Sequence, residues 1–586
     1  MKRRASFLAI LVFTVSVFSL PAVPQQQFRI AGVVVDSIAG APIERAEVTV
    51  APASNLGDAS TTLSASDGQF LFVGLAPGKY RLTASRVGYT DQGLDQHEGF
   101  MTAVAVGPKL DSEHIRFRLF RESVIAGTVL DEYGEPVRHA DMFLFRRGFS
   151  GGAHTTDLAG RTTADDLGLY RFPHLAPGTY FVVAYAKPWY STGSQVVDKV
   201  RYESTHEFRR LQVISVLQAS TDSDDPQPAL QPEPPPPPNP LRDVVYPLAF
   251  YSNAGSLDSA TPLTVSPGAT VTADFSLHPV SALHLLVKAP APPRDDAPRN
   301  TETGAAHFTT ENIPLGASLQ LAGIDLEQLP VRAADQMPGY FEIMNVVPGE
   351  ILFRSIARNE RGFSVQSTVQ QVTSENRVDL SSSAVVAVSG TVNPFPRLSL
   401  EATGGVAGGQ AFVSLVSADG RTTQMSQINA KGEFSLAVPA GKYTVDIAPP
   451  AFAHIASLQA TGADVSANSI TLSPGASVQL NARALQADAT VSGIALKNGR
   501  PFAGAMIVLV PEDSTQGAAL FHRDQSDSDG TFLMSPVYPG RYTLLAIENG
   551  WDLEWSKLSV LFPHLAAGTP LQVKSGANAN VTAKVQ

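Results

Sequence analysis

Short runs in which apolar and polar residues alternate, separated by turn-forming residues, extend along most of the chain. Residues 80–85 alternate in this way, and residues 542–546 repeat the alternation. A period of two residues predicts strands with one buried face, whereas helical periodicity is almost absent. We therefore predict an all-β protein.

One pattern of about fifteen residues occurs five times. It reads Asp-Gly or Gly, an aromatic residue and a short strand, then Pro-Gly or Ala-Gly and a second strand. Its copies span residues 66–82, 166–182, 338–351, 431–445 and 529–544. Asp-Gly predicts a tight hairpin turn, and Pro-Gly predicts a type II turn in which Gly adopts positive φ. Short, evenly spaced strands of this kind predict a tandem array of about five small Ig-like or prealbumin-like β-sandwich modules.

The repeat divides the chain into a leader and five modules. We place a signal peptide at 1–24 and the modules at 25–121, 122–279, 280–384 (divergent), 385–486 and 487–586. The second module contains an acidic, Pro-rich insert at 222–240, which we expect to be an extended polyproline loop or linker.

The N-terminus predicts export. Residues 1–4 read Met-Lys-Arg-Arg, and an uncharged, largely apolar run follows at 5–20. This pattern is typical of a secretory signal peptide, and the run is shorter than the ~20 residues of a membrane-spanning helix. We expect a protein of the periplasm, the cell surface or the medium, and an uncleaved N-terminal anchor is the alternative. Beyond this segment the sequence predicts no membrane span.

Composition narrows the function classes. The 586 residues include 44% hydrophobic residues, no Cys, and a net charge of −11. The negative charge argues against a nucleic-acid binder or a binder of anionic membranes. The absence of Cys excludes disulfides, thiolate metal sites and cysteine nucleophiles, so packed cores must stabilise the exported protein.

Several of these features resemble one family. The opening Gly-x-Val-x-Asp at 32–36, the Asp-Gly-x-Phe…Pro-Gly-x-Tyr pattern and Gly88-Tyr89 resemble the carboxypeptidase regulatory-like domain, a seven-stranded transthyretin-like sandwich related to the collagen-adhesin (Cna) B-type fold. The resemblance is good in modules 1, 2 and 5, fair in 4 and weak in 3. It implies an accessory domain without catalytic residues, of the kind found in exported bacterial proteins. A related starch-binding-like fold implies carbohydrate binding by analogy of fold.

One short motif has a catalytic interpretation. Residues 148–152, Gly-Phe-Ser-Gly-Gly, match the nucleophile elbow of hydrolases around Ser150. That elbow requires a strand before the serine and a helix after it. Residues 153–161 show no helical stripe, so a flexible hairpin loop is the favoured interpretation.

The motifs that could bind a metal ion are also incomplete or have a simpler explanation. His97-Glu98 and His206-Glu207 lack the second His, four residues on, of a zinc-peptidase helix. The aspartates of 527–529 and 165–166 could belong to calcium loops, but hairpin turns select the same residues. We expect no catalytic residue, no cofactor and no metal site.

Aromatic residues recur eleven positions after the turn glycine in four modules. They are Tyr89, Trp189, Phe452 and Trp551. One interpretation is a core plug that closes one end of the sandwich, and the other is a stacking platform for sugar or peptide. The recurrence favours the plug, but Trp189-Tyr190 and Trp551 with Trp555 carry more rings than a plug needs. Our candidate ligand contacts are Trp189, Tyr190, Trp551, Trp555 and Tyr89.

The leading hypothesis is a non-catalytic, exported multi-module binding or scaffold protein of the bacterial cell envelope, whose partner is a polysaccharide or another envelope protein. A purely structural spacer for an envelope complex is the first alternative, and it predicts an elongated particle. A secreted hydrolase that uses Ser150 is the second.

Overall fold

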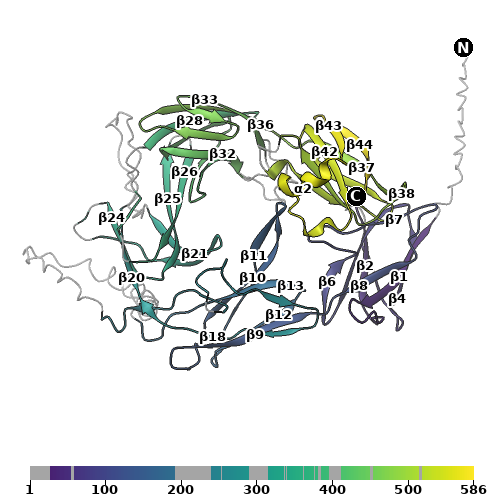
Figure 1. Ribbon diagram of the computed structural model, residues 1–586, viewed down its shortest axis with the longest axis horizontal. Coiled ribbons are helices and arrows are strands. Elements are labelled where there is room, and N and C mark those ends of the chain that lie inside the picture. The colour runs from purple at the N-terminus through teal and green to yellow at the C-terminus, as the bar shows by residue number, and fades with distance from the viewer. Residues whose placement is uncertain are drawn as a thin grey trace, which may run out of the picture.

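The computed structural model describes residues 27–54, 58–191, 239–252, 254–288, 315–334, 337, 339–359, 362–374, 377–380, 385–394, 411–448, 453–513 and 518–586. The predicted signal peptide and residues 222–238 of the Pro-rich insert lie outside this part of the chain. The described residues are almost entirely strands in many separate sheets (Figure 1), which confirms the all-β, multi-sandwich prediction.

Modules 1 and 2 hold the first eighteen strands. Module 1 contains β1 (Phe28–Asp36), β2 (Glu47–Pro52), β3 (Ser60–Leu63), β4 (Gln69–Leu75), β5 (Gly78–Arg86), β6 (Tyr89–Gly93), β7 (Val104–Val106) and β8 (Ile115–Leu119). Module 2 contains β9 (Ser123–Leu130), β10 (Asp141–Ser150), β11 (Ala153–Thr163), β12 (Leu169–Leu175), β13 (Gly178–Tyr185), β14 (Val244–Val245), β15 (Ala249–Phe250), β16 (Leu263–Val265), β17 (Thr270–Thr272) and β18 (Phe275–Ser276).

The remaining elements belong to modules 3 to 5. Module 3 contains β19 (Val280–Ser281), β20 (Leu283–Lys288), β21 (Gly316–Leu321), β22 (Ile324–Leu329), β23 (Arg332–Ala333), β24 (Tyr340–Val346), β25 (Gly349–Asn359), β26 (Gly362–Val372) and β27 (Arg377–Asp379). Module 4 contains β28 (Val385–Asn393), β29 (Phe412–Ser417), β30 (Thr422–Gln427), β31 (Glu433–Pro439), β32 (Gly441–Ala448), β33 (His454–Thr461), β34 (Asp464–Ser466), β35 (Ser469–Leu472) and β36 (Ser477–Leu485). Module 5 contains β37 (Ala489–Lys497), β38 (Arg500–Pro501), β39 (Met506–Pro511), η2 (Ala518–Leu520), β40 (His522–Gln525), β41 (Thr531–Val537), β42 (Gly540–Ile547), η3 (Gly550–Asp552), α2 (Leu558–Leu565), β43 (Thr569–Val573) and β44 (Asn578–Lys584).

All five modules share one strand-pairing scheme. The first strand pairs antiparallel with the strand of the Asp-Gly-x-Phe pattern and parallel with the closing strand, as β1 does with β4 and β8. In the facing sheet, the second strand of the module pairs antiparallel with the strand after Pro-Gly or Ala-Gly, as β2 does with β5. The sequence repeat is therefore also a structural repeat.

A glycine on the first strand permits the parallel pairing. A Cβ atom on Gly32 would lie 2.2 Å from the carbonyl oxygen of Ile115, and one on Gly493 would lie 2.0 Å from that of Val581. Gly127 and Gly390 meet their closing strands in the same way. The glycine of the opening motif is thus required because the closing strand approaches the backbone closely.

The expected type II turn at Pro-Gly is wrong. Gly78, Gly178, Gly349 and Gly540 begin the next strand and do not adopt positive φ. A tyrosine two residues later contacts two of these glycines: the Tyr542 ring lies 3.1 Å from the Cβ position of Gly540, and the Tyr180 ring lies 3.6 Å from that of Gly178. The Tyr542 hydroxyl donates to the carbonyl of Tyr538 at 2.8 Å, and Tyr180 and Tyr80 make the equivalent bonds to residues four positions earlier. A Cβ on Gly78 would meet no atom within 4 Å, so the tyrosine does not explain that glycine.

Two of the junctions between modules are continuous with the modules themselves. The β10–β13 sheet is buried on both faces: Met142 and Leu144 pack into module 2, whereas Phe143 and Phe145 pack into the core of module 3. Strand β26 pairs with β25 of module 3 on one side and with β30 of module 4 on the other, so that one nine-stranded sheet joins the two modules. Modules 2 to 4 are therefore more closely fused than a string of separate sandwiches.

The modules follow a closed course, in which module 5 (yellow) returns to module 1 (purple), as Figure 1 shows. His454 of module 4 contacts Tyr538 of module 5, with ring centroids 5.9 Å apart. Between modules 1 and 2, the Glu122 amide donates to the carbonyl of Gly88 at 3.0 Å.

Helix α2 was not predicted. Together with the loop before it, α2 covers the outer face of the β39–β42 sheet, where Leu561 is fully buried. No helix in the described residues is long and apolar enough to cross a membrane.

Candidate binding surface and the junction of the first and last modules

Tyr89, the first of the recurring aromatic residues, packs partly buried against the core of module 1. Its hydroxyl donates to the buried carboxylate of Asp36 at 3.1 Å, and Arg121 Nε donates to the same oxygen at 2.7 Å. Backbone amides of Ala39 and Ile38 also bind Asp36, and these hydrogen bonds hold the pKa of its carboxyl well below the usual range. These contacts are those of a plug that closes the end of the sandwich.

In module 2 the equivalent contact is made by Tyr190 rather than by Trp189. The Tyr190 hydroxyl donates to Glu132 Oε1 at 2.7 Å, and Tyr246 donates to the other oxygen at 3.0 Å. Burial and the bond to Glu132 raise the pKa of Tyr190. Arg242 Nε donates to the carbonyl of Tyr190 at 3.2 Å. Since Tyr190 is anchored, Trp189 is displaced outward: its ring is 74% exposed and meets Tyr190 edge-on at 5.7 Å.

Trp551 and Trp555 lie in a junction between modules 1 and 5, beside an arginine that the sequence analysis did not single out. The Trp551 ring stacks on His97 of module 1, with centroids 4.2 Å apart and planes 9° from parallel. The guanidinium of Arg523 lies 4.9 Å from the Trp551 centroid, 5.7 Å from Trp555 and 4.6 Å from Phe100 of module 1. We call Arg523 and these three aromatic rings the arginine box.

The arginine box also contains an ion pair between modules. Arg523 donates to Glu98 at 3.1 Å and to the carbonyl of His97 at 3.3 Å, and its side chain is fully buried. Burial raises the pKa of Glu98 despite the nearby guanidinium, and burial lowers the pKa of His97. A buried arginine with an acidic partner and three rings is a strong but geometrically demanding contact.

Backbone hydrogen bonds extend this junction. The Ser528 amide donates to the carbonyl of Ala103 at 3.0 Å. In return, the amides of Ala103 and Ala105 donate to Asp527 and to the Ser528 hydroxyl, both at 2.8 Å. Lys79 forms an ion pair with Asp527. Module 5 thus caps the edge of the module 1 sheet at β7, which protects that edge from pairing with other chains.

Two further titratable residues lie on β40. Burial raises the pKa of Asp524 to about 6 and lowers the pKa of His522, whose ring contacts Tyr538, to about 4. In both residues burial disfavours the charged form.

A hairpin of module 2 contacts module 5 next to the arginine box. β10 runs into β11 through a tight turn, and Ser150 pairs with Ala153. The Ser556 amide donates to the carbonyl of Gly152 at 3.2 Å, and the His154 amide donates to Glu554 at 3.0 Å. A strand therefore follows Ser150, where a nucleophile elbow requires a helix.

The candidate metal ligands serve other purposes. Asp529 accepts bonds from the amide and hydroxyl of Thr531, and Asp165 accepts from the amides of Leu167 and Leu169, as turn-capping aspartates do. Within the described ranges, no three His, Asp or Glu residues are grouped as a metal ion would need. His206, Glu207 and Phe452 lie outside those ranges.

A comparison with protein families matches residues 29–109. The matching model is that of the carboxypeptidase regulatory-like domain. The match spans this module and less than half of the chain. No curated protein matches the chain.

A search of solved structures finds matches of low sequence identity. The Bacillus anthracis TIE protein is 9% identical over 96% of this chain and 75% of its own, with a TM-score of 0.17. GBS52, the minor pilin of Streptococcus agalactiae, is 13% identical over 43% and 96%, with a TM-score of 0.19. BcpA, the major pilin subunit of Bacillus cereus, is 11% identical over 79% and 99%, with a TM-score of 0.13.

Module 1 contributes Phe100 of the arginine box, together with its partners His97 and Glu98, through the segment between β6 and β7. His97 and Glu98 were weighed in the sequence only as zinc ligands, and Arg523 was not considered. A polar strand such as β40, His-Arg-Asp-Gln, predicts solvent exposure, because the sequence does not reveal that another module will cover it.

Proposed function

We propose that this chain is a non-catalytic, exported scaffold protein of the bacterial cell envelope, which holds its modules in a fixed closed arrangement and presents Trp189 to a partner. The observation that carries the proposal is the construction of the junctions. A shared core, a shared sheet and the arginine box replace the flexible linkers that tandem domains usually have. A closed arrangement of this kind does not fit the elongated spacer that was the first alternative.

Trp189 supports a binding role because it is exposed next to a residue, Tyr190, that hydrogen bonds anchor. Tyr133 and Leu241, 81% exposed each, adjoin in sequence Glu132 and Arg242, the residues that bind Tyr190. Exposed large apolar side chains are typical of protein-binding surfaces. This favours another envelope protein as the partner of Trp189, with a polysaccharide as the alternative.

A pull-down from a bacterial envelope fraction and from immobilised polysaccharides tests this role. Trp189→Ala should lose the partner, while Phe562→Ala, which removes an equally exposed ring on α2, should retain it. Equal retention by both variants would argue against Trp189. Esterase and peptidase screens with a Ser150→Ala control test the absence of catalysis, and an activity that this variant loses would overturn it.

A further inference from the structure

On three strands of the four-stranded sheet of module 4, the outer face is polar but almost uncharged. On the fourth strand, β31, Glu433 lies opposite Thr391 and accepts a hydrogen bond from the Asn429 side chain. In this sheet β36 lies between β28 and β33. Alternate residues at 389–393, 479–483 and 457–461 point away from the core, three on each strand. Eight of these nine are Ser, Thr, Asn or Gln, and Arg483 is the one charged residue. An ordinary solvated face would carry roughly a quarter to a third charged residues of both signs.

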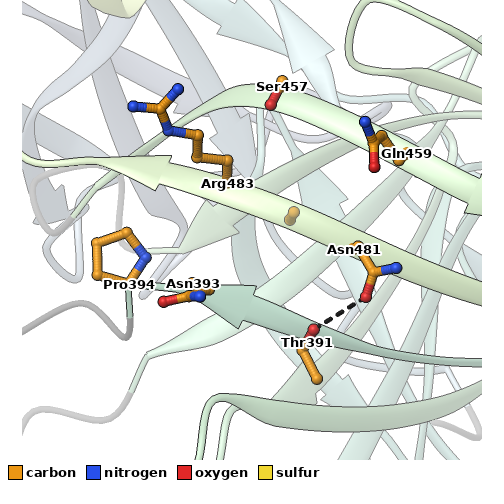
Figure 2. A pocket seen from close by; sticks show the side chains of 8 residues that line it. Thr391, Asn393, Pro394, Ser457, Gln459, Asn481 and Arg483 are labelled. Atoms are coloured by element: carbon orange, nitrogen blue, oxygen red, sulfur yellow. Dashed lines mark hydrogen bonds between the residues drawn. The ribbon is translucent and has the colours of Figure 1, made fainter.

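Strand register brings these side chains together in rows. Thr391 of β28 lies opposite Asn481 of β36, which in turn lies opposite Gln459 of β33. The next row consists of Asn393, Arg483 and Ser457. Figure 2 shows these six side chains lining one open groove of about 510 Å³, a volume within the range of ligand-binding sites.

Hydrogen bonds along the rows orient the amides. The Thr391 hydroxyl donates to Asn481 Oδ1 at 3.1 Å, as the dashed line in Figure 2 shows, and the Ser389 hydroxyl donates to Gln479 Oε1 at 2.7 Å. Because each amide oxygen accepts from a neighbour, each amide nitrogen is left to donate outward. Asn481 therefore presents a donor inside the groove, and Gln479 presents one on the same face beside it.

β33 widens this face. The corresponding sheet of module 1 is β4-β1-β8 and ends at the closing strand, whereas in module 4 β33 pairs with the closing strand β36 along eight residues. Ser457 and Gln459 come from this added strand. Without it, the groove would lack one wall.

We propose that this groove is a binding site for a neutral polysaccharide chain. A ligand for it must offer many hydroxyl groups to amide and hydroxyl partners, must lie in a shallow open groove, and needs neither charge nor a large apolar group. A protein partner would instead need an apolar or aromatic centre, which the lining residues do not offer. The site is separate from the Trp189 surface and does not depend on it.

Affinity electrophoresis of the full mature chain through gels containing dextran, galactomannan or xyloglucan tests the proposal. At least one of these neutral polymers should retard the protein. The double substitution Gln459→Ala/Asn481→Ala should weaken this retardation at least tenfold. Asn580→Ala, which removes an exposed amide from the closing strand of module 5, should leave it unchanged, as should Trp189→Ala.

Since Gln459 and Asn481 are exposed, the double variant should keep the thermal unfolding midpoint of the wild type, which excludes misfolding as the cause. Retardation by none of the three polymers, or retardation that the double variant retains, would overturn the proposal. A gel containing polygalacturonate, a charged polysaccharide, serves as a further control. Retardation in that gel alone would overturn the proposal as well, because it would indicate simple charge attraction to Arg483. None of these results depends on whether Trp189 binds a partner.

Discussion

Removal of Arg523 should open the junction between modules 1 and 5 without unfolding either module. Arg523→Ala breaks a pair in which the arginine is fully buried and the Glu98 side chain is 32% exposed. Breaking a fully buried pair costs about 3–5 kcal/mol, and the partial exposure of Glu98 reduces this to about 2 kcal/mol. Loss of the cation–π contacts with three rings adds about 1 kcal/mol.

Together these changes would weaken the contact between modules 1 and 5 by about 3 kcal/mol, which raises the population of molecules with an open junction about 100-fold. Hydrogen exchange measures this directly, because the amides of Ala103 and Ala105 donate across the junction. Their protection should fall by about that factor. Arg541→Ala is the matched control: its pair with Glu512 at 3.0 Å is exposed, so its loss should cost less than 1 kcal/mol. If the Ala103 and Ala105 amides were as well protected in Arg523→Ala as in Arg541→Ala, the role given to the arginine box would be refuted.

Three further changes test other parts of the account. Asp524→Asn should be as stable as the wild type near pH 4 and more stable than the wild type, by up to about 3 kcal/mol, near pH 6. The reason is that the folded wild type binds the Asp524 proton more tightly than the unfolded chain does, so the wild type loses stability as the pH rises over this range. Urea unfolding at several pH values measures the difference, and a difference that does not change with pH would contradict the reasoning. Gly152→Ala should increase the hydrogen exchange of the Ser556 amide, since the new Cβ would lie 2.6 Å from Ser556 Cβ. Gly151→Ala should leave this exchange unchanged, because its Cβ would meet no atom within 4 Å. Tyr542→Phe should cost about 1 kcal/mol in urea unfolding and Tyr80→Phe clearly less, because only the first hydroxyl bond is buried; equal losses would contradict this.

The repeat was predictable because each copy encodes its own turns and strands. Asp-Gly at 67–68 and 529–530 gives positive φ at both glycines, as local turn chemistry requires. The Pro-Gly turn was misjudged because the glycine does not adopt positive φ, and at Gly178 and Gly540 it contacts the ring of a tyrosine two residues later. Such a side-chain contact is not visible in turn propensity alone.

The junctions could not be predicted, since they depend on residues hundreds of positions apart. Arg523 and Glu98 read as surface charges in isolation, and Phe143 and Phe145 suggest only a strand buried on one face. Helix α2 is eight residues long and contains Pro563, which is too short and irregular for a periodic signal. Trp189 differs from Tyr89 because the next residue, Tyr190, forms the hydrogen bond to Glu132, two residues past the end of β9.

The central claim is that the first and last modules are in contact in the free protein. Since the chain has no Cys, cysteines introduced at the exposed residues Gly78 and Ser528 would be its only thiols. Their neighbours Lys79 and Asp527 form an ion pair across the junction, so spin labels at the two positions should give one narrow distribution of short distances. That result would support a closed scaffold. A broad distribution extending to the length of several modules would contradict it.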